Sequence, residues 1–298
     1  MKTTRNLPLV KLLGILLLAL VVGFGFSRVH HKSTAQATIA PVKSHTATPT
    51  PQPTASTAQP SAHVDAQLQQ IVDTWAAQHS FDSSVVVQEL NGNLRTAGHN
   101  QENLMTTAST YKIYVAYAVL HEVEQGTYTM NTATRTGQTV SAALQKMILQ
   151  SDNTSAEALG FLVGWDRIDA LAASVGATHT DINNYNSAGV AANGDKQSTA
   201  GDLTVVVTKL QQGGLLNAAD TQLLLGLMKN QVWRERVPAG VPSGIAVADK
   251  PGWLGDVEND AAIVYGPKST YTLVIMTNGS TTQPLADLSR LIYNYLET

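Results

Sequence analysis

The sequence predicts an α+β fold in which both ends of the chain form one antiparallel sheet, with flanking helices and an inserted all-helical lobe. Segments rich in β-branched residues occur near residues 83–100 and again after residue 244, whereas helical spacing dominates between them. Strands that lie at the two ends of a chain complete a sheet by pairing with each other. Apolar residues make up 43% of the chain and charged residues 14%, which indicates a globular core.

Residues 1–32 are predicted to be an N-terminal signal or membrane anchor. Lys2 and Arg5 precede an apolar run over 7–26, about the ~20 residues that cross a bilayer once Lys11 reaches back to the interface. Basic residues separate this run from an A-x-A-like cleavage site at 35–37, so we favour an uncleaved anchor over a cleaved signal. Either form predicts an extracytoplasmic protein of the bacterial cell envelope, membrane-anchored or secreted.

Residues 33–64 are predicted to form a flexible linker. Thr, Pro, Ala, Ser and Gln dominate this stretch, and its apolar surface is too small to offset the entropy lost on folding. The folded domain is therefore expected over residues 65–298, on a tether that suits work in a cell wall.

The first folded elements are a helix and a hairpin. Asp65 is a suitable N-cap, and apolar residues then recur at helical spacing, namely Leu68, Ile71, Val72 and Trp75. Residues 83–100 contain β-branched residues on both sides of an Asn-Gly turn at 91–92, which is typical of a hairpin.

The remaining elements follow in the order helices, then strands, then a helix. The run from Ser109 to about residue 126 is apolar on every side, which predicts a fully buried helix. Further helices are expected over 141–150 and from Thr199, where Asp202 completes a capping-box-like start. Strands are expected at three later segments, and a closing helix near 285–292; the strand segments are 244–250, 260–266 and 269–277.

Charge and cysteine content exclude several classes of protein. The residues before Asp65 carry six basic and no acidic side chains, so 13 basic and 22 acidic residues remain in the folded part. Such an acidic domain repels phosphate backbones, so no nucleic-acid partner is expected. The chain has no cysteine, which excludes disulfides and thiol catalysis.

No metal or other cofactor is expected. His121 and Glu122 begin a near match to the zinc motif H-E-x-x-H, but Gln125 takes the place of the second histidine. We interpret this segment as the exposed end of the buried helix.

Three short motifs stand in one order: Ser-Thr-Tyr-Lys at 109–112, Ser-Asp-Asn at 151–153 and Lys-Pro-Gly at 250–252. Each is weak alone, since about one S-x-x-K match arises by chance in a chain of this length. At a helix start, however, Ser109 and Lys112 lie on one face, one turn apart. A serine needs an adjacent base to act as a nucleophile, and a desolvated lysine can be neutral enough to serve.

With these motifs, the chain resembles class A β-lactamase-like serine hydrolases of the penicillin-binding protein and serine β-lactamase superfamily. The resemblance runs from about residue 65 to the end. Neighbouring segments agree with it, namely SDNTSAEAL at 151–159, STAGDL at 198–203, RVPAG at 236–240 and DKPG followed by NDAAIVY at 249–265. The spacing between the first two motifs is shorter than is typical, so a trimmed helical lobe is expected.

The resemblance implies a role for each motif residue. Ser109 would be the nucleophile, Lys112 its general base and Ser151 a proton relay toward the leaving nitrogen. The substrate-binding residues would be Asn153, Lys250, Gly252 and Trp253. Among these, Asn153 would bind the substrate side-chain amide and Lys250 would be an electrostatic anchor. The backbone N–H groups of Ser109 and Trp253 would form the oxyanion hole.

Two departures from the family pattern bear on activity. The β-lactamases of the family activate water with a glutamate on a loop, but the stretch 180–197 has no glutamate and only Asp181 and Asp195 as carboxylates. Pro251 replaces the usual Thr or Ser, which removes a hydroxyl that would bind a substrate carboxylate. Because proline cannot donate to a ladder, it also predicts that this strand lies at the sheet edge.

Two other residues have more than one interpretation. Trp253 could be a stacking platform for a substrate ring or a core residue at a strand end. Glu258 is interpreted as a turn charge rather than a catalytic acid.

The leading hypothesis is a hydrolase that opens β-lactams or related amides through a Ser109 acyl-enzyme, and so confers antibiotic resistance. The alternatives are a D-alanyl-D-alanine carboxypeptidase or slow penicillin-binding protein acting on peptidoglycan, and a non-catalytic cell-wall binding module. A Ser-His-Asp triad is disfavoured because no G-x-S-x-G elbow accompanies the histidines of the domain, which are His79, His99, His121 and His179. We expect a monomer.

Overall fold

The structure is a computed structural model that describes residues 61–183 and 195–298. The predicted anchor, most of the predicted linker and part of the 180–197 stretch lie outside the described residues. No helix among the described residues is both long and apolar enough to cross a bilayer.

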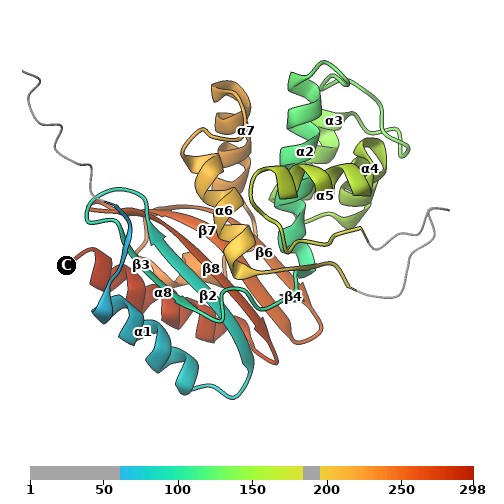
Figure 1. Ribbon diagram of the computed structural model, residues 1–298. Helices are drawn as coiled ribbons and strands as arrows, with labels where there is room; N and C mark the ends of the chain where they lie inside the picture. The colour runs from blue at the N-terminus through green and yellow to red at the C-terminus, as the bar shows by residue number, and fades with distance from the viewer. Residues whose placement is uncertain (1–60, 184–194) are drawn as a thin grey trace, which may run out of the picture. The chain divides into compact units, whose positions relative to one another are not determined.

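A six-stranded sheet joins the two ends of the folded chain (Figure 1). Its order is β1 (His63–Val64), β3 (Arg95–His99), β2 (Asp82–Glu89), β8 (Thr270–Asn278), β7 (Val257–Tyr265) and β6 (Ala246–Leu254). β2 pairs antiparallel with β8 along its whole length, from Asp82 opposite Asn278 to Glu89 opposite Tyr271. The predicted pairing of both chain ends in one sheet is therefore confirmed.

The sheet differs from the prediction at one edge. β1 pairs parallel with β3, His63 with Arg95 and Val64 with Thr96, so the sheet is mixed rather than wholly antiparallel. The two residues of β1 had been placed in the linker, because a two-residue strand has no periodicity to detect. The opposite edge strand is β6, as Pro251 predicts.

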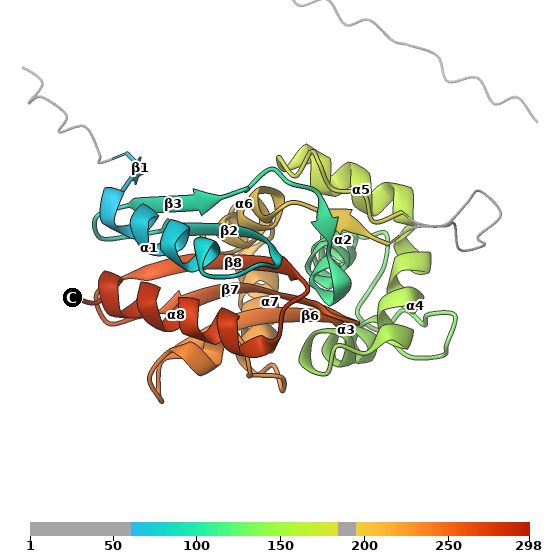
Figure 2. The ribbon, with the colours of Figure 1, turned by 90° about the horizontal axis from the view of Figure 1, so that it is seen from below.

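Two helices cover one face of the sheet (Figure 2). They are α1 (Ala66–Ala77) and α8 (Thr282–Leu296), which bury leucine, isoleucine and Trp75 against the strands. The predicted N-cap of α1 is confirmed, since the Asp65 carboxylate accepts a hydrogen bond from the Leu68 backbone N–H at 2.8 Å.

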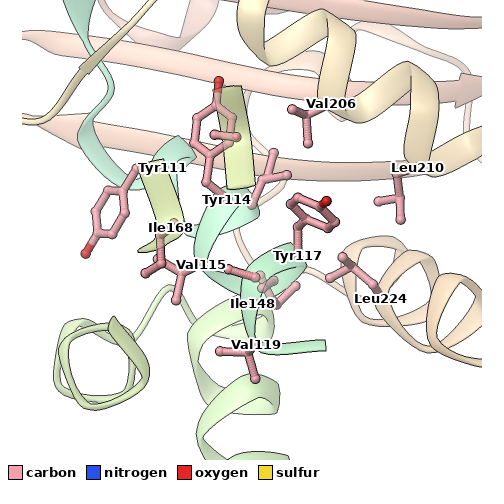
Figure 3. Packing of buried hydrophobic residues seen from close by; sticks show 14 of the residues in the cluster. Tyr111, Tyr114, Val115, Tyr117, Val119, Ile148, Ile168, Val206, Leu210 and Leu224 are labelled. Atoms are coloured by element: carbon pink, nitrogen blue, oxygen red, sulfur yellow. The ribbon is translucent and has the colours of Figure 1, made fainter. Parts of the chain in front are cut away.

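The helical lobe lies over the other face. It contains α2 (Lys112–Glu124), α3 (Val140–Leu149), α4 (Asn153–Val163), α5 (Trp165–Ser174), α6 (Ala200–Gln211) and α7 (Ala218–Lys229). Figure 3 shows α2 at the centre of this core, where Tyr114, Val115 and Val119 pack among side chains of neighbouring helices. α2 is buried on every side, as its sequence predicts.

The buried helix begins later than predicted. Ala108–Tyr111 forms a 3₁₀ turn (η1), and α2 follows from Lys112. Just before this turn, β4 (Met105–Thr106) pairs with β5 (Gln197–Ser198) in a separate two-stranded sheet. A second 3₁₀ turn, η2 (Val237–Gly240), packs on α8.

Candidate active site

The three motifs meet at one pocket, although they lie far apart in the chain. Ser109 is on η1, Ser151 lies between α3 and α4, and Lys250 is on β6. A pocket of about 250 Å³ is lined by Ser109, Asn153 and Trp253 together. A larger cavity, of about 500 Å³ beside β4, contains none of the predicted site residues, so we place the candidate site at the smaller one.

Lys112 connects Ser109, Ser151 and Asn153 through hydrogen bonds of its Nζ. Its side chain is fully buried, and its Nζ lies 2.9 Å from Ser109 Oγ, 2.6 Å from the Ser151 carbonyl oxygen and 2.7 Å from Asn153 Oδ1. Burial lowers the pKa of Lys112 to about 8, although the Asp152 charge opposes the shift. A neutral amine can donate to the carbonyl and amide oxygens and still accept the Ser109 proton. The geometry therefore supplies a base for the serine.

Ser151 lies between two lysines. Its Oγ is 2.9 Å from Lys250 Nζ and 3.2 Å from Lys112 Nζ. The backbone of Ser151 has a positive φ of 59°, and Ala108, next to Ser109, has a φ of 45°. Left-handed backbone at non-glycine residues costs about 1–3 kcal/mol and concentrates at functional sites. The fold thus holds Ser151, and the residue before Ser109, in backbone conformations that local propensity disfavours.

Lys250, from β6, lies on the same side of the site as Lys112, since both contact Ser151 Oγ. It is fully buried, and its Nζ also donates to the Pro251 carbonyl oxygen at 2.7 Å. Burial, followed by the charge of Lys112, lowers the pKa of Lys250 well below its usual range. Two lysines that share one hydroxyl partner therefore disfavour each other's protonation.

Gly252 allows β6 to approach η1 closely. A Cβ at this position would lie 2.7 Å from the Ser109 backbone nitrogen and 2.8 Å from that of Thr110, far inside van der Waals contact. Only glycine fits here, since the obstructing atoms are backbone. The contact brings the backbone of the Gly252–Trp253 segment against the Ser109 amide.

Two buried carboxyl groups that the sequence reasoning missed support β6 from its other face. Asp249 accepts from Arg234 Nη1 at 2.6 Å, and Asp260 accepts from the Val237 backbone N–H at 3.1 Å. Burial raises the pKa of Asp260 to about 6, and burial together with the Asp260 charge raises the pKa of Asp249 well above its usual range. Their only sequence signal is that both fall in apolar strands.

The pocket wall that contains Glu157 and Asp195 carries exposed rather than buried charged groups. Glu157 and Asp195 line the pocket, and Glu157 pairs with Arg135 at 3.2 Å while about half of each side chain stays exposed. Sequence reasoning missed Glu157, although it follows Asn153 by four residues on α4 and so shares its face. Asp181 instead pairs its backbone with Gln197, a structural role.

Lys196 lies beside Asp195 on this wall. Its Nζ is 3.7 Å from the centre of the Trp165 ring, and burial lowers its pKa to about 8 against the charge of Asp169. The Lys196 carbonyl oxygen accepts from the Thr107 backbone N–H at 2.9 Å. This bond fixes the wall to the segment that carries Ser109.

The structure settles three residues whose interpretation was open or different. Trp253 is 39% exposed at the rim of the pocket, so it is a surface residue and not a core residue, while its role as a stacking platform stays a prediction. Glu258 lies inside β7 and pairs with Arg236, so its assignment to a turn is wrong. Glu122 is buried and receives a 2.9 Å hydrogen bond from Arg167 Nε, so it is not part of an exposed helix end.

Comparison with known proteins gives a family and a fold. Residues 64–296 match the model of the family described as "Beta-lactamase enzyme family". No curated protein matches the chain. Solved structures cover most of it and resemble it closely in fold.

An acyl-enzyme complex of a PBP-A variant with penicillin G has a TM-score of 0.71 and 23% identity, covering 80% of this chain and 99% of its own. A β-lactamase from Sphaerobacter thermophilus has a TM-score of 0.68 and 20% identity, with 76% and 96% covered. A variant of the last common ancestor of Gram-negative class A β-lactamases has a TM-score of 0.68 and 23% identity, with 76% and 98% covered.

Proposed function

The chain belongs to the β-lactamase enzyme family, and from this premise we propose that it is a serine hydrolase that opens β-lactams or related amides through a Ser109 acyl-enzyme. The observation that carries the proposal is the 2.9 Å contact between Ser109 Oγ and Lys112 Nζ. A fully buried lysine with a pKa near 8 is partly neutral at physiological pH and can deprotonate the serine as it attacks.

The proposed acylation uses the contacts of the site in sequence. The Ser109 hydroxyl proton passes to neutral Lys112 while Oγ bonds to the carbonyl carbon. The backbone N–H groups of Ser109 and Trp253 stabilise the developing oxyanion. The amide C–N bond then breaks, and the proton moves from Lys112 through the Ser151 hydroxyl to the leaving nitrogen. Water finally hydrolyses the ester and restores the serine.

Substrate binding is proposed to use three further groups. The Asn153 side-chain oxygen faces Lys112, which leaves its NH₂ group to donate to a substrate amide oxygen. Lys250 Nζ, which lies 2.9 Å from Ser151 Oγ, supplies a hydrogen-bond donor on the leaving-group side of the site. Pro251 offers no hydroxyl there, so a substrate carboxylate has one donor fewer and we expect weak ground-state binding.

A peptidoglycan D-alanyl-D-alanine carboxypeptidase, or a slow penicillin-binding protein, is the second candidate. It is favoured by the absence of glutamate from the 180–197 stretch. A non-catalytic binding module would not need a lysine desolvated against its serine.

The proposal is tested by intact mass spectrometry of the protein with benzylpenicillin over seconds to hours. A mass gain on Ser109 that decays supports the hydrolase, and a gain that persists selects the slow penicillin-binding protein. Wild type and Ser109→Ala that behave identically toward β-lactams and D-Ala-D-Ala peptides would contradict both.

We also propose that residues 1–32 anchor the protein and that the linker after them holds the catalytic domain outside the cytoplasm. The support is the apolar run behind Lys2 and Arg5 and the Thr- and Pro-rich stretch that follows. Fractionation of cells that express the full chain, with and without residues 1–32, tests this: loss of the segment should release the protein from the membrane fraction.

A further inference from the structure

We propose that a second pocket beside Trp253 is a subsite for a cationic group on the leaving-group half of the substrate. The inference deepens the proposed function and rests on it. The pocket has a volume of about 300 Å³ and is lined by Trp233, Glu235, Arg236, Trp253, Glu258 and Thr282. Because Trp253 also lines the Ser109 pocket, the two pockets share a wall.

Two exposed indoles form the aromatic part of the subsite. Trp233 is 41% and Trp253 39% exposed, and their ring centroids lie 5.3 Å apart at an interplanar angle of 66°. Covering either ring with a ligand would remove apolar surface from water, which favours binding. Two large aromatic side chains held at the rim of a reactive pocket are a surface that a ligand can cover.

Trp233 and the two residues before it are held in place by hydrogen bonds to the end of α3. Trp233 Nε1 donates to the Gln150 carbonyl oxygen at 3.2 Å, and the Val232 backbone N–H donates to the Leu149 carbonyl oxygen at 3.1 Å. Just before them, the buried Gln231 side chain donates to the Ile148 carbonyl oxygen at 2.6 Å. The segment is therefore fastened to the end of α3 and needs little ordering when a ligand binds.

These contacts also fix which half of a substrate reaches the pocket. Gln150 directly precedes Ser151, the proposed proton donor to the leaving nitrogen. Asn153 and Glu157 line the Ser109 pocket but not the second one. A substrate whose acyl part lies toward Asn153 therefore extends its leaving-group part past Trp253 toward Trp233.

The charges of the pocket favour a cation. Arg236 is only 4% exposed and is paired with Glu258, and its guanidinium packs over the Trp253 ring at 5.1 Å. Glu235 reaches Arg236 only at 3.9 Å, and 56% of its side chain is exposed. Two carboxylates against one arginine leave formal negative charge beside two indoles, and aromatic faces attract cations.

The test compares two cephalosporins that carry the same acyl side chain. Cefotaxime has a neutral acetoxymethyl group on the leaving-group side, and cefepime has a cationic N-methylpyrrolidinium group there. The measurement is the second-order rate constant for Ser109 acylation at low ionic strength. We expect cefepime to acylate wild type about fivefold faster than cefotaxime, from one exposed cation–π contact and one screened ion pair.

Two variants and a control assign the effect. Trp233→Ala and Glu235→Gln should each lower the cefepime-to-cefotaxime ratio toward one. Glu102→Gln removes a comparably exposed carboxylate that lines neither pocket and should leave the ratio at the wild-type value. A Ser109 adduct with equal rates in wild type, or a ratio that neither variant lowers, overturns the subsite alone. No Ser109 adduct from either compound overturns the proposed function together with the subsite.

Discussion

The two walls of the Ser109 pocket differ in how firmly they are built. On one wall, Lys112 and Lys250 are fully buried, bonded to Ser151 at 3.2 and 2.9 Å, and shifted toward neutrality. On the other, the Glu157 carboxylate is half exposed and paired with Arg135. Preorganised polar groups lower a barrier because they pay no reorganisation during reaction. Under the proposed acyl-serine mechanism, this difference means that the site is better organised for acylation than for hydrolysis of the ester.

Removing the amine of Lys112 should give the largest effect. Lys112→Met keeps the length and burial of the side chain but removes the base, so the acylation rate constant should fall by about 10²–10⁴-fold. Stopped-flow measurement with a chromogenic cephalosporin gives this rate. Lys268→Met, in the exposed β7–β8 turn, is the matched control and should acylate at the wild-type rate. Equal rates in both variants would remove Lys112 from the mechanism.

The second-largest loss of acylation rate is expected from Gly252→Ala, which displaces Ser109 but leaves its hydroxyl in place. Gly252→Ala places a methyl group 2.7 Å from the Ser109 backbone nitrogen, so β6 and η1 must separate and acylation should fall by about 10²-fold. Gly226→Ala is the control, since its Cβ in α7 would meet nothing within 4 Å and should stabilise the helix slightly. Wild-type acylation by Gly252→Ala, measured by mass spectrometry, would contradict the proposed packing requirement.

Substitution of Glu157, on the more exposed wall of the pocket, should change only the rate at which the acyl-enzyme is hydrolysed. Glu157→Gln removes a carboxylate on the pocket wall, and we expect the acyl-enzyme lifetime to lengthen by about tenfold, below the range of a well-placed base. The lifetime is read from the decay of the adduct mass after excess penicillin is removed. Asp195→Asn is the comparison; a longer lifetime in that variant only would assign water activation to Asp195 instead.

The smallest expected effect is a shift in the pH profile. Acylation by wild type should rise with pH through about 8, because the neutral amine is the base and burial lowers the pKa of Lys112 to that value. The Asp152 charge raises this pKa, so Asp152→Asn should move the midpoint to lower pH and increase the rate at pH 7 by about two- to threefold. Asparagine caps α4 as well as aspartate does, so the helix should be unaffected. A midpoint that moves upward would contradict this account.

Sequence reasoning was strongest where a pattern is long. The central strands, the fully apolar α2 and the helix capped by Asp65 are each long enough to show a regular pattern, and each is confirmed. β1, β4 and β5 have two residues each, too few to show a period. The 3₁₀ turn at Ala108–Tyr111, which packs closely against β6 at Gly252, could not be predicted either, since no local sequence pattern marks it.

The candidate site likewise contains residues that the sequence predicted and residues that it did not. The three motifs named the side chains that meet at Ser109, because each motif carries chemistry in a fixed spacing. Glu157, Asp260 and Trp233 were missed, since their part in the site depends on tertiary contacts with distant segments. Of these, only Glu157 had a usable signal, four residues after Asn153 on one helix face.

The comparison of the two walls is tested most directly by measuring acylation and release in one time course. The wild-type protein is mixed with benzylpenicillin, and the intact mass is followed from milliseconds to hours, with Ser109→Ala alongside. The account predicts that a Ser109 adduct accumulates rapidly and has a lifetime many times longer than the time it takes to form. No adduct is expected in Ser109→Ala. Turnover without accumulation would contradict the comparison of the two walls while supporting the proposed hydrolase. An adduct that survives the loss of Ser109 would contradict the proposed nucleophile.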